Sequence, residues 1–255
     1  MNALVVLSLI LLVLMYIVGN KQGLRAFFAL FLNFIVLLVA IAFWVNPEVN
    51  MFIVGLLTFV AIGMINLFFI NGVNEKTKAA FIALMIVVSL LVLFIRMITS
   101  QAMIQGFGEE EVEELAPFSL YVGLDFVEIV AIIMIMSAVG AMMDVAISIS
   151  TSMYELYKRN QKMTNRELFQ SGMTIGRDIL GTDTNTLFFA FFGGYLALLI
   201  WFKDLSYSFG EILNSKVFSA EMMTIFSAGV GIACIIPLTS LMRIYYIQRM
   251  RNKGL

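Results

Sequence analysis

One long apolar run of the sequence carries small, polar and ionisable residues at helical spacing. The run extends from Phe126 to Tyr157, and these residues recur at steps of three or four, so they share one face of a helix. They are Ser137, Gly140, Asp144, Ser148 and Ser152. A carboxylate near the middle of a bilayer is costly and is usually kept for an ion pathway or a proton relay. Asp144 is therefore the first candidate for chemistry, as a proton-carrying group. The alternative interpretation is a tight helix interface around one satisfied carboxyl group.

A second polar segment, SGMTIGRDILGTDTNT at positions 171 to 186, opens the next apolar run. If the two helices are antiparallel, a rise of about 1.5 Å per residue brings Asp183 to the depth of Asp144. The same rise puts Arg177 and Asp178 about two turns closer to the cytoplasm. Arg177 is either a positive partner that tunes the carboxyl group or a headgroup anchor beside Asp178. Three residues next to Asp183 can form hydrogen bonds with Asp144 in either protonation state: Thr184, Asn185 and Thr186.

Membrane-spanning helices must position these side chains. Hydrophobic residues make up 61% of the chain and the mean hydropathy is +0.97, far above the values of soluble proteins. Crossing a hydrocarbon core takes about 20 apolar residues in a helix. The sequence predicts an all-α, polytopic bundle of about seven spans, with close packing or a bend at Gly193-Gly194. The expected spans are Ala3–Gly19, Leu24–Val45, Met51–Ile70, Thr77–Ile98, Phe126–Tyr157, Thr174–Phe202 and Glu221–Ile247.

The charge distribution predicts the orientation of this bundle. With the N-terminus outside and the C-terminus in the cytoplasm, 13 of the 16 Lys and Arg residues fall on or near the cytoplasmic side. The acidic sequence at positions 108 to 114 then lies outside, where we interpret it as a solvated face without a site. The chain divides into a four-helix membrane region (1–98), an acidic external segment (99–125) and a three-helix membrane core (126–255), which includes a cytoplasmic loop (158–173).

Composition excludes several classes of function. Histidine is absent and Cys234 is the single cysteine, so imidazole relays, internal disulfides and thiolate metal clusters are not available. The net charge of −1 provides no basic surface for a nucleic acid, and no P-loop occurs. We therefore expect no cofactor, no metal and no nucleic-acid partner. The expected surroundings are a lipid bilayer, and proton chemistry must use carboxylates.

Three stretches of the two polar segments, at positions 137–150, 171–182 and 184–186, resemble the YibE/F family of bacterial multispan membrane proteins. The resemblance covers roughly the C-terminal half of the chain. This resemblance implies the bacterial cytoplasmic membrane, and either a longer YibE/F-like paralogue or a second copy as partner. A weaker likeness extends to the membrane half of SecD/SecF and RND-type exporters, and it implies an RND-like C-terminal half and proton-driven export. The residues in comparable places are Gly140, Asp144, Arg177, Thr184, Thr186, Gly193 and Gly194.

The expected function is that of a membrane subunit in a proton-linked exporter or secretion factor, not that of an enzyme. The alternative is a non-catalytic scaffold, or a partner subunit of the longer paralogue, in which Asp144→Asn would preserve assembly and activity. A remote alternative is an intramembrane aspartyl protease with Asp144 and Asp183 as its dyad. The Gly-x-Gly-Asp signature of such proteases is absent, because the second carboxylate stands in Gly181-Thr182-Asp183.

Overall fold

The structure is a computed structural model that describes residues 2–46, 48–104 and 125–252. The acidic sequence at 108–114 lies outside the described residues. Within them the chain forms helices and short links without a strand, which confirms the all-α prediction. The elements are α1 (Ala3–Trp44), α2 (Met51–Met64), the π-helical turn η1 (Ile65–Phe69), α3 (Glu75–Ala102), α5 (Phe126–Arg159), α6 (Asn165–Gly194), α7 (Leu196–Asp204), α8 (Phe209–Asn214) and α9 (Lys216–Asn252).

The long helices coincide with the apolar runs of the sequence. In the described part of the chain, five helical segments are long and apolar enough to cross a membrane: α1, α2 with η1, α3, α5 and α9. The bent pair of α6 and α7 is a sixth candidate. The chain is therefore a multi-pass membrane protein by length and composition of its helices.

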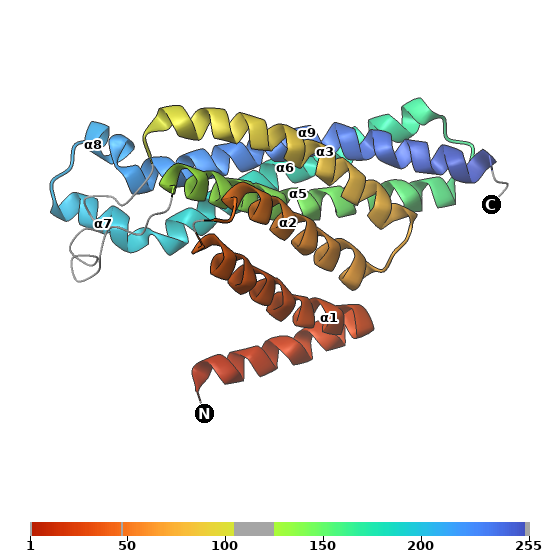
Figure 1. Cartoon of the computed structure of the whole chain (residues 1–255). Helices are drawn as coiled ribbons and strands as arrows, with labels where there is room; N and C mark the ends of the chain where they lie inside the picture. The colour runs from red at the N-terminus through yellow and green to blue at the C-terminus, as the bar shows by residue number, and fades with distance from the viewer. Residues whose placement is uncertain (1, 47, 105–124, 253–255) are drawn as a thin grey trace.

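Helix α1 contains two of the predicted runs because it reverses direction within its length. Asn20 has a φ of 49° and a ψ of −133°, and Figure 1 shows α1 folding back on itself. Gly23 is required at this reversal, since a Cβ there would overlap the backbone carbonyl of Met15. The first part of α1 (residues 3–19) is largely exposed and projects away from the other helices (Figure 1). The second part is anchored to η1 by a hydrogen bond from Asn33 Nδ2 to Asn66 Oδ1 at 3.0 Å.

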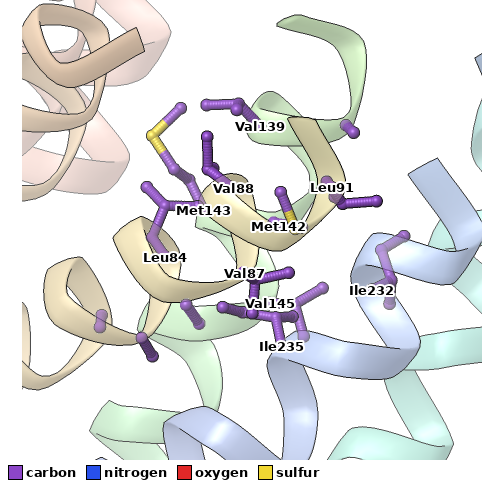
Figure 2. Packing of buried hydrophobic residues seen from close by; sticks show 14 of the residues in the cluster. Leu84, Val87, Val88, Leu91, Val139, Met142, Met143, Val145, Ile232 and Ile235 are labelled. Carbon is purple, nitrogen blue, oxygen red and sulfur yellow. The ribbon is translucent and has the colours of Figure 1, made fainter. Parts of the chain in front are cut away.

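The core of the molecule lies between α3, α5 and α9. Figure 2 shows branched aliphatic and methionine side chains of these three helices interlocking. Small residues bring the helices close together: Ala80 and Ala83 of α3 are fully buried, and a Cβ at Gly231 of α9 would lie 2.8 Å from Met142 Sδ of α5. Such packing is what stabilises helix association where lipid is as apolar as the side chains.

Helix α6 packs on α9 and α5 and then bends. Two buried glycines, Gly172 and Gly176, lie against Ser240 and Ile236 of α9. At its other end α6 stops at Gly194, and α7 continues at an angle of 57°. A Cβ at Gly193 or Gly194 would meet nothing within 4 Å. These two glycines therefore mark the bend, one of the two outcomes expected for them, and not a close helix contact.

Successive connections lie at opposite ends of the bundle. Figure 1 shows the reversal in α1, the α2–α3 link, the α5–α6 link and the C-terminal end of α9 at one end. The N-terminal end of α1, the α1–α2 link and helix α8 lie at the other end (Figure 1). This alternation is the one that a chain crossing the same layer repeatedly must have.

Candidate functional site on helices α5 and α6

The candidate face of α5 is directed away from the core. The buried side of α5 is apolar and includes Met142, Val145 and Ala146. On the other side Gly140, Asp144 and Ser148 are exposed, while Ser137 and Ser152 are half-buried. A Cβ at Gly140 would meet nothing within 4 Å, so this glycine makes no close helix contact in the chain. The face is thus not a tight interface within one copy of the chain.

Asp183 of α6 lies near Asp144 of α5. The two carboxyl groups are close enough to repel one another when both are ionised. Asp144 is near the middle of α5, and Asp183 is near the middle of the combined length of α6 and α7. In the described part of the chain, no hydrogen bond reaches the Asp144 carboxyl group. The pair is therefore a site of two carboxyl groups with free capacity to bind a proton or a polar ligand.

The other sequence-predicted residues of α6 do not orient Asp144 in this conformation. The Thr184 hydroxyl donates to the Leu180 carbonyl at 2.7 Å, and its methyl group faces Gly229 of α9. The Thr186 hydroxyl donates to the Thr182 carbonyl at 2.9 Å. Asn185 is exposed on the outer side of the helix.

Arg177 and Asp178 lie on that same outer side. Both side chains are exposed, and neither forms an ion pair within the residues that the structure describes. Their position on α6 is a turn and a half closer to its N-terminal end than Asp183. The structure therefore brings Asp144 and Asp183 together and leaves Arg177, Asp178 and Asn185 on an open surface.

Comparison with protein families places the chain in a known group. The family model described as YibE/F-like protein matches residues 7–249. The chain belongs to the YibE/F-like family. The match covers almost the whole chain and so extends beyond the C-terminal half, which carries the motifs that resemble the family. No curated protein and no solved structure matches the chain.

A buried arginine in this YibE/F-like chain was not among the sequence-predicted site residues. Arg243 of α9 is 0% exposed, and its Nε, Nη1 and Nη2 atoms have no hydrogen-bond partner in the described part of the chain. Its guanidinium carbon lies 4.9 Å from the centre of the Tyr154 ring, and Lys76 Nζ lies 4.8 Å from the same ring. The signal in the sequence is a charge inside the apolar run Glu221–Ile247, close to its cytoplasmic end.

The described residues hold no group of three or more His, Cys, Asp and Glu side chains suited to a metal ion. The two neighbouring carboxyl groups of Asp144 and Asp183 are the chemistry that the fold brings together. Proton binding is what such a pair can do without a cofactor.

The start of α6 is fixed by a capping box outside the apolar part of the helix. Glu167 Oε2 accepts hydrogen bonds from the Thr164 backbone N–H at 2.7 Å and from the Thr164 hydroxyl at 3.0 Å. These bonds hold the pKa of Glu167 below its ordinary value of 4.5. Because the folded-state pKa is lowered, the stabilisation is present above the unfolded pKa and is lost as the pH falls through the folded pKa.

We expect Glu167→Gln to lower the thermal unfolding midpoint at neutral pH by a small amount, and this difference from the natural chain to shrink as the pH falls below 4.5, the ordinary pKa of glutamate. Thermal unfolding of the detergent-solubilised protein across pH measures it. Glu128→Gln, at a half-buried first-turn position of α5 without a capping box, is the control. A difference that stays constant down to acid pH would contradict the assignment.

Proposed function

We propose that this chain is the membrane subunit of a proton-linked exporter or secretion factor in which Asp144 carries the proton. The observation that carries the proposal is the position of Asp144 beside Asp183 on adjacent long helices. Carboxyl groups in the middle of membrane helices are costly and mark proton and ion pathways. The absence of histidine from the sequence leaves carboxyl groups as the side chains for this task.

The pair offers a simple way to couple a proton to a movement of helices. When both carboxyl groups are ionised, their repulsion favours separation of α5 and α6 at this depth. When either carboxyl group binds a proton, it loses its charge, and the repulsion between the two groups disappears. Alternate loading and release of the proton would then change how the two helices lie against one another, which is the kind of two-state element that a transporter needs.

The proposed topology has seven crossings, with the N-terminus outside and the C-terminus in the cytoplasm of a bacterium. Support comes from the basic residues, which gather at the end of the bundle that holds the α2–α3 link, the α5–α6 link and the C-terminal end of α9 (Figure 1). These residues include Lys76, Lys78, Lys158, Arg159, Lys162, Arg166, Arg249 and Arg251. The likeness to the membrane half of SecD/SecF and RND-type exporters supports export as the coupled process.

A partner subunit belongs to the proposal because the candidate face of α5 is open. Asp144 and Ser148 are exposed in the isolated chain, although they lie within an apolar helix. Either a longer YibE/F-like paralogue or a second copy would cover them. A scaffold without transport activity remains the alternative, and it differs in requiring no protonation of Asp144.

Water access to this face is the property that tests the proposal. A cysteine at Ser148, in a Cys234→Ser background, is labelled with a membrane-impermeant maleimide across pH, with and without Asp144→Asn. A cysteine at the exposed loop residue Gln161 corrects for the intrinsic pH dependence of maleimide, and one at the exposed apolar residue Leu93 of α3 reports a lipid-facing position. We expect corrected labelling at Ser148 to change with pH only in the variant that keeps Asp144, and we expect no labelling at Leu93.

Labelling that is absent at Ser148 at every pH would overturn the proton pathway and favour the scaffold. Labelling with the same pH dependence in the Asp144→Asn variant would remove Asp144 from the proton-carrying role. The proximity of Asp144 and Asp183 also suits an intramembrane aspartyl protease, which a cleaved substrate peptide that disappears with Asp183→Asn would reveal.

A further inference from the structure

The outer face of α6 is polar and has no partner in the chain. Its residues recur at steps of three or four over three turns, and all are exposed. They are Thr174, Arg177, Asp178, Gly181, Thr182 and Asn185. The opposite side of the helix is the packed one, where Gly172 and Gly176 lie against α9. Helix α6 is thus polar on the side that points away from its own bundle.

Lipid cannot solvate such a face. An uncovered Arg or Asp within a membrane helix is costly, up to about 2.5–3.5 kcal/mol at the helix centre. Arg177 and Asp178 are exposed and form no ion pair within the described residues, so the chain itself does not offset that cost. A protein surface with groups of opposite charge is the covering that removes it.

We propose that the outer face of α6 binds the same face of a second copy across a two-fold axis perpendicular to the membrane. Membrane insertion gives every copy the same orientation, so equal residues of two such copies meet at equal depth. Arg177 and Asp178 are neighbours of opposite charge that differ in depth by about 1.5 Å. In a parallel pair of α6 helices, each Arg177 therefore faces Asp178 of the second copy, and two ion pairs form.

The rest of the face suits the same pairing. Gly181 follows the charged residues by one turn, and its lack of a side chain lets the two helix backbones approach. Asn185 is another turn along and carries both a donor and an acceptor, so two Asn185 side chains can pair across the axis. The face carries one positive and one negative side chain and is therefore complementary to the same face of a second copy. This favours a second copy over a partner whose surface carries charges of a single sign. The inference rests on the proposed membrane placement of α6 and does not require proton coupling.

Disulfide trapping in native membranes tests the pairing. The full chain, in a Cys234→Ser background and expressed without a paralogue, carries one cysteine at Thr174 or Asn185. Phe226, which is 63% exposed on α9, provides the matched control position. Under mild oxidation we expect a covalent homodimer from Thr174→Cys and from Asn185→Cys, and no dimer from Phe226→Cys. The same dimer is expected when Asp144→Asn is added, which separates this inference from the proton-carrying role.

A charge exchange supplies the second test. Arg177→Asp places four acidic side chains at the two-fold axis. Because this removes the close charge pairs, we expect the yield of disulfide-trapped dimer to fall at least about tenfold. The double variant Arg177→Asp/Asp178→Arg restores complementarity and should restore trapping. Absence of dimer at both Thr174 and Asn185, equal trapping at Phe226, or an adduct with a protein of different mass would overturn the pairing.

Discussion

Replacing Gly176 by alanine should lower the free energy of unfolding by about 1–3 kcal/mol. A Cβ at this position would overlap Ile236 Cγ2 of α9 and lie 2.9 Å from its Cγ1 and 3.1 Å from its Cβ. Isoleucine is branched at the Cβ atom and has one preferred rotamer in a helix, so its side chain cannot swing aside. Helix α6 must then shift away from α9, and the packed contact that holds the candidate site in place is weakened.

Gly140→Ala in α5 is the matched control, because an added Cβ there would meet nothing within 4 Å. This variant should keep or raise stability, since alanine favours helix over glycine by up to about 1 kcal/mol. Denaturation of the detergent-solubilised protein, followed by tryptophan fluorescence, measures both variants. Adding Ile236→Ala to Gly176→Ala should recover part of the loss. Equal stability of the Gly176→Ala and Gly140→Ala variants would show that α6 does not pack on α9 at this point.

Replacing Arg243 by methionine should raise the free energy of unfolding by about 1–4 kcal/mol. The guanidinium group is fully buried and its nitrogens have no hydrogen-bond partner among the described residues. Contact with the face of the Tyr154 ring offsets only part of the cost of desolvating the charge. Methionine has a similar reach and adapts to irregular space, so it can fill the position without a charge.

The matched control is Arg249→Met, at an exposed position of the same helix, which should change stability by less than about 0.5 kcal/mol. Arg243→Lys keeps the charge and loses the planar stacking, so it should be less stable than the methionine variant. If Arg243→Met were instead the least stable of the three, the guanidinium group would have acceptors from water or lipid in the membrane.

Hydropathy and helical geometry predicted the elements of this fold because a bilayer imposes both. The run Phe126–Tyr157 became α5 (Phe126–Arg159), and Met51–Ile70 became α2 with η1. The prediction that Asp183 reaches the depth of Asp144 agrees with the proximity of the two carboxyl groups in the structure. It followed from antiparallel connection and constant rise alone, without any knowledge of side-chain packing.

The same information could not predict which side of each helix packs against the other helices. In a membrane both the buried side and the lipid-facing side of a helix are apolar, so periodicity does not say which side meets the core. The alternative interpretation placed Asp144 in a tight helix interface, whereas the structure has it on an exposed face of α5. The interior position of Arg243 depends on the space beside Tyr154, which three helices create together and no local pattern encodes.

The reversal at Asn20 leaves the first part of α1 with few contacts to the rest of the protein. At about 1.5 Å per residue, residues 3–19 form a rod of about 26 Å, shorter than a typical hydrocarbon core of about 30 Å. Since few protein contacts hold this rod, bilayer thickness governs its tilt and depth more than that of any helix in the packed core. A thicker membrane must thin locally around it, so the chain carries at its N-terminus a segment matched to one range of membrane thickness.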